Sequence, residues 1–188
     1  ALFAPSLGHE FVNWDTHRLL VENPHYRGLG PEQLRWAFST RYFGIYMPLS
    51  WLSYSLDYAL WGMRPAGYHL TNVILHSLNA ALFTLAATRL LALGADAAQT
   101  IRLRLCAAGS ALLFALHPLR VESVAWVTER RDVLCGFFLL AALLSYLPPE
   151  GKGAGRAAPG RLVLSFLFYL SAVLSKGIAV TFPLVLWV

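Results

Sequence analysis

Asp15 is the side chain near the start of the chain that is best suited to acid–base chemistry. It directly follows Trp14 in the string FVNWD. A carboxylate beside an indole ring loses part of its hydration, and desolvation makes a carboxylate a stronger base. Asp15 is therefore a candidate general base. The alternative is that Asp15 caps a short helix, since Asp is favoured at the N-cap position.

A second polar segment, residues 117–132, reads HPLRVESVAWVTERRD and lies between two apolar runs. On a helix, Glu122 and Glu129 would share a face because they are seven residues apart. The neighbouring guanidinium groups of Arg130 and Arg131 match phosphate oxygens in pairs, which makes them candidate phosphate ligands. The alternative is a helix at a membrane surface whose acids and bases neutralise one another.

Lys176 is a further candidate phosphate ligand. It lies between two apolar runs and has no acidic neighbour in the sequence. If it faces the same side as the arginine pair, its ammonium group can bind the same phosphate. The alternative is a lysine at a helix end that extends toward lipid headgroups.

One apolar run carries a stripe of polar side chains at three- and four-residue spacing: His69, Asn72, His76 and Asn79. Lipid offers such groups no hydrogen-bond partner, so the stripe is expected to face protein. Two histidines without a carboxylate beside them are a weak metal signal, and we expect hydrogen bonds between helices instead. We predict no metal site. Asp57 is either a helix-surface acid or a partner of Arg64.

The composition indicates what kind of protein holds these side chains. Of the 188 residues 57% are apolar and 13% are charged, and the mean hydropathy is +0.53. In typical soluble domains about 45–50% of the residues are apolar and about 25% are charged. This excludes a disordered chain, a coiled coil and a disulfide-stapled module, and it disfavours a water-soluble enzyme. The net charge of +5 comes from 15 scattered Lys and Arg, so no nucleic-acid surface is predicted. Cys106 and Cys135 lie in separate apolar blocks, which argues against a disulfide.

The apolar runs predict an all-α protein, a polytopic bundle of membrane helices. The expected membrane helices are residues 65–88, 101–116, 133–149, 162–175 and 177–188. Residues 9–64 are rich in Trp and Tyr, as in a segment lying among lipid headgroups. There Pro31 predicts a helix start, and apolar residues at 49, 52, 56 and 60 predict a second short helix.

Loop charges give the expected orientation. Residues 89–104 and 147–161 each hold three bases and one acid, whereas residues 9–64 and 117–132 are each balanced. By the positive-inside rule the first two loops are cytoplasmic and the balanced segments lie on the other side. The chain lacks an initial Met and ends inside an apolar run, so we expect a fragment, with a helix before residue 1 and more membrane protein after residue 188.

Three strings resemble the membrane part of a known family: FVNWD…VENPHYRGLGPEQLRWAF, PLSWLSYSLDYALWGMRPAGYHLTNVILHSLNAALF and LFALHPLRVESVAWVTERRDVL. The family consists of bacterial tetratricopeptide-repeat membrane proteins related to the animal transmembrane-and-tetratricopeptide-repeat O-mannosyltransferases. The closing LSKGIAVTFPLVL also resembles the family, so the resemblance runs over nearly the whole chain.

The resemblance implies a GT-C glycosyltransferase architecture, in which helices span the membrane and a large first outward loop carries an acidic residue. Such enzymes are similar in taking a sugar from a polyprenyl-phosphate carrier and passing it to an acceptor, a Ser or Thr hydroxyl in the animal relatives. The resemblance implies no tightly bound cofactor and leaves a divalent metal open. It also implies that tetratricopeptide repeats beyond residue 188 bind an acceptor protein.

Residue by residue, the family's acidic pair falls on Asp15 and Thr16, so the second acid is replaced. If both carboxylates are required, the chain is a non-catalytic membrane scaffold presenting a repeat domain. If the first suffices, activity survives. The second outward loop keeps the family's register at four positions: His117, Glu122, Arg130 and Asp132.

We therefore expect a membrane glycosyltransferase acting on the outer face of a bacterial inner membrane, with Asp15 deprotonating the acceptor hydroxyl. The leaving lipid phosphate would be neutralised by basic side chains. Those expected at the phosphate are Arg130, Arg131, Lys176 and His117. Those expected to support the site are Glu122, Asp132, His69 and Asn72. A transporter would need inverted repeats, which the sequence lacks.

Overall fold

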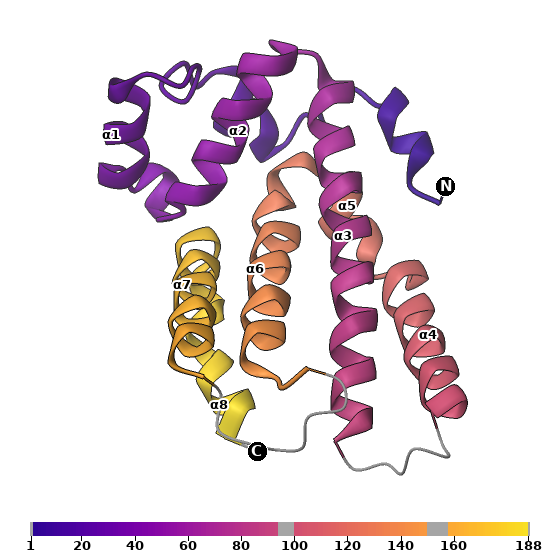
Figure 1. Ribbon diagram of the computed structural model, residues 1–188. Coiled ribbons are helices and arrows are strands. Elements are labelled where there is room, and N and C mark those ends of the chain that lie inside the picture. Colours follow the sequence, from indigo (N-terminus) through magenta and orange to yellow (C-terminus); the bar gives the residue numbers. More distant parts are fainter. Residues whose placement is uncertain (1, 94–99, 150–157, 188) are drawn as a thin grey trace.

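The computed structural model describes residues 2–93, 100–149 and 158–187. Within these ranges every regular element is a helix, so the all-α prediction is confirmed for the described chain. Four longer helices form a bundle that is covered at one end by shorter helices (Figure 1).

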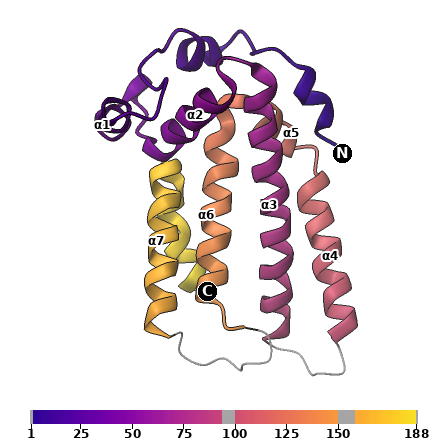
Figure 2. The ribbon, with the colours of Figure 1, turned by 45° about the horizontal axis from the view of Figure 1, so that its top comes forward.

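The four long helices stand side by side in the order α4, α3, α6, α7 (Figures 1 and 2). They comprise Pro65–Ala92 (α3), Thr100–Leu116 (α4), Arg130–Tyr146 (α6) and Pro159–Ser175 (α7). α3 packs against α4 on one side and α6 on the other, and α6 packs against α7. Neighbours in this row are therefore not always neighbours in sequence, since α6 packs against α3 although α4 and α5 lie between them in the chain.

α3 is the one described helix long and apolar enough to cross a membrane. It starts at Pro65, as predicted, and continues to Ala92. α4, α6 and α7 have 17 residues each. At about 1.5 Å per residue such a helix is about 26 Å long, somewhat less than the hydrocarbon core of a bilayer. Length and composition thus support one membrane-crossing helix, and the full bundle is part of the proposal below.

The run expected to form one helix over 177–188 is described as far as residue 187, and there it is divided into two successive helical elements. The structure has a 3-10 helix, η6 (Gly177–Thr181), followed by the six-residue α8 (Phe182–Trp187). Pro183 explains the division, because a proline inside a helix lacks the backbone donor and its ring clashes with the carbonyl four residues earlier. The change of element starts directly after Lys176.

Residues 9–64 form a cap at one end of the bundle (Figure 2). The cap contains the one-turn π-helix η2 (His17–Val21), α1 (Pro31–Ser39), the 3-10 turn η3 (Tyr42–Gly44) and α2 (Pro48–Trp61). Both α-helices begin with a proline, whose fixed φ suits the first turn. The two short helices expected in this segment are therefore confirmed.

The best-packed part of the described chain lies in the cap. Aromatic side chains dominate it: Tyr26, Trp51 and Tyr54 of the cap have no exposed surface, and neither has Tyr68 of α3, which packs into the same core. Their rings meet mostly edge to face, the favoured arrangement for aromatic pairs. On α2 the aromatic and polar face is inside, whereas Leu56 and Leu60 are 49% and 63% exposed. This rigid cap fixes the residues that hold the candidate site.

Candidate active site

Residues 9–64 and residues 117–132 meet at Asp15 and Thr16. The Thr128 hydroxyl donates a hydrogen bond to Asp15 Oδ1 over 3.1 Å, and Trp126 Nε1–H donates to Thr16 Oγ1 over 3.2 Å. Asp15 is half-buried, and Thr16 is 1% exposed. The structure therefore joins the candidate base to a turn more than 100 residues away in the sequence.

The turn that contacts Asp15 is η5 (Val127–Glu129), which connects the short helix α5 (Arg120–Ala125) to α6. The Tyr54 hydroxyl donates to the carbonyls of Val127 and Thr128 at 3.1 and 3.2 Å. Burial raises the pKa of Tyr54, which keeps this phenol a hydrogen-bond donor. Asn72 Nδ2 donates to the carbonyls of Val124 and Trp126. Side chains of α2 and α3 thus fix the backbone of this turn through hydrogen bonds to its carbonyl groups.

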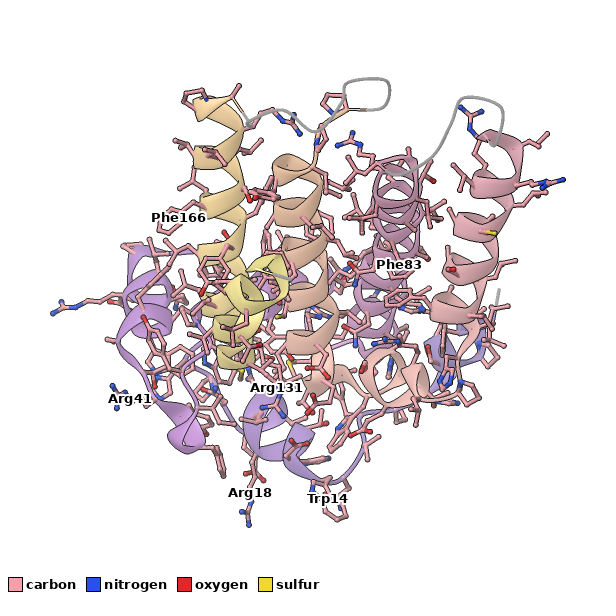
Figure 3. All side chains as sticks on the ribbon, turned by 90° about the horizontal axis from the view of Figure 1, so that it is seen from below. Trp14, Arg18, Arg41, Phe83, Arg131 and Phe166 are labelled. Carbon is pink, nitrogen blue, oxygen red and sulfur yellow. The ribbon has the colours of Figure 1, made fainter. Side chains whose placement is uncertain are left out.

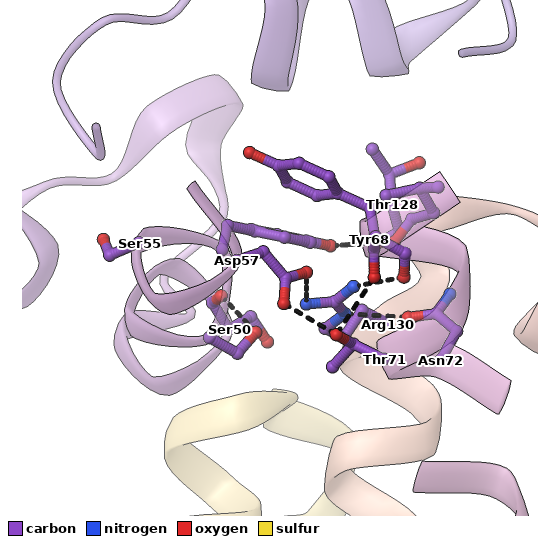
Figure 4. A network of polar contacts seen from close by, with 12 residues as sticks. Ser50, Ser55, Asp57, Tyr68, Thr71, Asn72, Thr128 and Arg130 are labelled. Atoms are coloured by element: carbon purple, nitrogen blue, oxygen red, sulfur yellow. Dashed lines mark hydrogen bonds and ion pairs between the residues drawn. The ribbon is translucent and has the colours of Figure 1, made fainter. Parts of the chain in front are cut away.

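Arg130 follows this turn and lies in the interior, with no exposed surface (Figure 4). Its guanidinium forms an ion pair with Asp57 and donates to Asn72 Oδ1 and to the Tyr68 carbonyl, both at 2.7 Å. The group also lies over the Tyr54 ring, 4.9 Å from its centroid. Arg130 is thus a buried connection between the cap and the bundle. Because its side chain is enclosed by these partners, we do not include it among the candidate phosphate ligands.

The same contact decides between the two roles foreseen for Asp57. Asp57 is 1% exposed and pairs with Arg130 rather than with Arg64. The Thr71 hydroxyl donates to its Oδ1 over 2.7 Å. Asp57 is therefore an interior partner in an ion pair and not a helix-surface acid.

A partly exposed charged cluster lies where η5 joins α6, beside the end of α7. Its members are Glu129, Arg131, Asp132 and Lys176. Arg131 binds Glu129, and Lys176 binds Asp132 while its Nζ lies 3.6 Å from Glu129 Oε2. Lys176 thus has two acidic neighbours in space although it has none in sequence, because α7 ends beside the start of α6.

Glu129 is ionised in this cluster. Burial would raise its pKa, but the hydrogen bond from Arg131 and the charges of Arg131 and Lys176 bring the pKa below its ordinary value. The cluster holds two acids and two bases, so their formal charges balance. Arg131 and Lys176 keep 23% and 30% of their side chains exposed, which leaves part of each cation accessible. In Figure 3, Arg131 lies at the same end of the molecule as Trp14 and Arg18 of the cap.

Two of the expected site residues lie on the surface, away from the described contacts of this cluster. His117 is exposed at the end of α4, and its Nδ1 accepts a hydrogen bond from the Leu119 backbone N–H. It lines a mainly apolar cavity of about 360 Å³ together with Phe3 and His9. Glu122 is exposed on α5. Among the described residues no contact links either side chain to Asp15, Arg131 or Lys176.

The polar stripe of α3 faces protein, as predicted. His76 Nε2 is 3.0 Å from the Ala115 carbonyl of α4, and Asn79 Nδ2 donates to the Val133 carbonyl of α6. His69 is buried, and its ring meets His9 edge to face. The stripe therefore supports neighbouring elements. Over the described ranges no group of three or more His, Cys, Asp or Glu side chains is arranged to hold a metal ion.

A cavity of about 270 Å³ adjoins the charged cluster. It lies among α3, α4, α5 and α6, and Asp132 belongs to both its lining and the cluster. Its other polar lining residues are Arg120 and Ser123 of α5 and His76 and Asn79 of α3, whereas Phe83 and Leu140 are among its apolar ones.

Comparisons with known proteins identify relatives along almost the whole chain. It is 36% identical to mouse protein O-mannosyl-transferase TMTC1 and 33% identical to the human protein of that name, over 95% of the chain in each case. It is 37% identical to the Drosophila melanogaster protein O-mannosyl-transferase Tmtc1 over 96% of the chain. The chain is a relative of the TMTC proteins. It spans about a fifth of the length of these relatives. No family model and no solved structure matches.

In this TMTC relative, three residues that contact the candidate site were not singled out from the sequence: Tyr54, Trp126 and Thr128. Trp126 and Thr128 lie inside the polar segment that drew attention for its charges. Their hydrogen-bonding groups, a hydroxyl and an indole N–H, carry no charge and belong to no motif with a recognisable spacing. The available signal was their position, in the string that carries the resemblance to the TMTC proteins and next to the charged residues.

Proposed function

We propose that this chain is the part of a membrane glycosyltransferase that transfers a sugar from a polyprenyl-phosphate carrier to a protein hydroxyl. The names of the relatives, protein O-mannosyl-transferases, support sugar transfer to a protein, and mannose is the sugar they suggest. The observation that carries the proposal is the hydrogen bond between Thr128 and Asp15. It holds a half-buried carboxylate beside the turn that leads directly into the charged cluster.

In the proposed reaction Asp15 is the general base. Its Oδ1 accepts the Thr128 hydrogen bond, which leaves Oδ2 to take the proton of the acceptor hydroxyl. The acceptor oxygen then bonds to the anomeric carbon of the sugar, and the bond from that carbon to the phosphate oxygen breaks. The bonding electron pair leaves with the carrier phosphate. Proton removal by a positioned side chain typically contributes about 10²–10⁴-fold to the rate.

Arg131 and Lys176 are proposed to bind the carrier phosphate. Each is held by an acid, Arg131 by Glu129 and Lys176 by Asp132, so each cation is oriented before the ligand arrives. A guanidinium has five N–H donors and an ammonium three, so both keep donors for phosphate oxygens. Fixed cations at the leaving group stabilise the charge that develops there. The cavity beside Asp132 is proposed to hold the first part of the carrier chain.

We place the long helices in a bacterial inner membrane, with the cap and residues 117–132 on the non-cytoplasmic side. The ends of α3 and α6 and the starts of α4 and α7, which border the two basic loops, lie at the opposite end of the bundle from the cap (Figure 2). That arrangement supports one cytoplasmic side for both loops. The acceptor protein is proposed to bind through tetratricopeptide repeats beyond residue 188.

The test uses the full-length protein in membranes and a panel of radiolabelled polyprenyl-phosphate sugars, each offered with and without a divalent metal. Asp15→Asn should abolish transfer to a protein acceptor while the protein stays folded, because an amide accepts the Thr128 hydrogen bond but does not act as a base. The matched control is Glu32→Gln, which changes an exposed acid of α1 and should leave transfer unchanged.

Full activity of Asp15→Asn would refute the role of this carboxylate. A folded wild-type protein that transfers no sugar from any donor would instead favour the scaffold, which the replacement of the second acid by Thr16 suggests.

A further inference from the structure

We infer that Thr128 is a positioning residue that sets the orientation of the Asp15 carboxylate. The inference rests on the proposed function, in which Asp15 is the base. The Thr128 hydroxyl is the described side-chain group that bonds to this carboxylate, at 3.1 Å. A carboxylate that acts as a base must present one oxygen to the acceptor, and small displacements of a catalytic group cost large factors in rate.

The position of Thr128 is fixed by its own surroundings. It is 3% exposed, and its backbone carbonyl accepts the Tyr54 hydroxyl from α2. Two residues later, Arg130 is enclosed by contacts with α2 and α3 (Figure 4). The hydroxyl of Thr128 is therefore held by the rigid part of the molecule.

Asp15 belongs to the cap, but the residues directly before it have much less support than the aromatic core of the cap. Its neighbour Trp14 is 75% exposed, and Val12 and Asn13 are also exposed. Asp15 itself is half-buried and lies just before the single turn of η2. Since the residues before it contribute little packing around the carboxylate, the orientation of that group depends on what residues 117–132 supply.

The two hydrogen bonds between these segments have different effects: one fixes the backbone beside Asp15, and the other orients the Asp15 carboxylate. Thr16 is buried, and its hydroxyl accepts the Trp126 indole N–H, which anchors the backbone next to Asp15. Thr128 then orients the carboxylate itself. A threonine hydroxyl can accept an indole N–H, so position 16 keeps its structural contact without a second acid. Asp15 alone then provides the base.

A second threonine–carboxylate pair provides the matched control. Thr71 of α3 donates to Asp57 Oδ1 over 2.7 Å, which is the same chemical contact in the interior network. Replacing either threonine by valine removes one hydroxyl and keeps the branched shape. A general effect of losing such a bond would appear in both variants, whereas an effect on positioning would appear only in Thr128→Val.

The experiment measures kcat and KM of the full-length protein for the donor that the wild type uses. Thr128→Val should lower kcat roughly 10- to 100-fold, the factor expected for losing one hydrogen bond to a charged group, with KM for the donor little changed. Thr128→Ser should restore kcat because it returns the hydroxyl. Thr71→Val should lower the thermal stability and leave kcat near that of the wild type.

Wild-type kcat in Thr128→Val, or equal losses of kcat in both valine variants, would overturn the inference while leaving the proposed function intact. Failure of Thr128→Ser to recover activity in a folded protein would also overturn it. If the wild type transfers no sugar, the proposed function itself fails and the inference fails with it.

Discussion

The buried ion pair between Arg130 and Asp57 allows a quantitative test of the junction between the cap and the bundle. Arg130→Met keeps much of the side-chain volume and removes the charge. The change leaves the carboxylate of Asp57, which is 1% exposed, without its cation. Removing one partner of a buried pair costs about 3–5 kcal/mol of unfolding free energy, mainly because the other charge stays buried.

Two further contacts place the expected loss toward the upper end of that range. Arg130→Met also removes the hydrogen bonds to Asn72 Oδ1 and to the Tyr68 carbonyl, so two interior acceptors lose a donor. An unsatisfied buried acceptor such as Asn72 Oδ1 costs about 1–3 kcal/mol, whereas the Tyr68 carbonyl keeps its backbone hydrogen bond within α3. The losses overlap because the three groups share one guanidinium. We expect a destabilisation of about 4–5 kcal/mol.

The assay is equilibrium or thermal unfolding of the full-length protein in detergent micelles, with Asp57→Leu and the double variant completing a double-mutant cycle. The double variant should be more stable than Arg130→Met alone, because no unpaired charge remains inside. A loss below about 1 kcal/mol for Arg130→Met would show that the guanidinium is solvated. That result would refute the structural role and return Arg130 to the candidates for phosphate binding.

Two further changes test the charged cluster and the entry into α3. The pKa of Glu129 is below its ordinary value of 4.5, so its ion pairs stabilise the protein above that pH and the stabilisation is lost as the pH falls through the lowered pKa. Unfolding temperatures measured from pH 7 to pH 3 should therefore decline less in Glu129→Gln than in the wild type; parallel curves would contradict the assigned pairing. A Cβ at Gly67 would lie 2.3 Å from Trp61 Cγ, so Gly67→Ala should cost about 1–3 kcal/mol in chemical unfolding despite the better helix propensity of alanine. Unchanged or increased stability would show that Trp61 moves aside freely.

Sequence periodicity predicted the elements better than their partners. Apolar runs located α3, α4, α6 and α7, and Pro31 located the start of α1, because these signals are local. The apolar content of 177–188 alone predicts one helix, whereas the structure has η6 followed by α8, which contains Pro183. The prediction that the polar stripe on α3 faces protein is confirmed, because the spacing of side chains along a helix shows which of them share one face.

The contacts of the candidate site could not be read in the same way. Asp57 and Arg130 are 73 residues apart, and Asp15 and Thr128 are 113 apart. A single sequence shows that a charge near apolar runs needs a partner, but it does not show which one. Lys176 illustrates this. It follows the end of α7, and its acidic partners lie at the start of the preceding long helix, α6. The packing of α6 against α7 decides that pairing, and no local pattern encodes it.

The partners of the carboxylates separate their roles. Asp57, Glu129 and Asp132 each pair with a cation, and at Glu129 the neighbouring positive charges lower the pKa. The described partner of Asp15 is a neutral hydroxyl, which orients the carboxylate without supplying a charge. Carboxylates in one region acquire different functions when their environments differ in this way. Asp15 thus differs from the three paired acids in having a neutral hydrogen-bond partner, and the three paired acids hold cations in place.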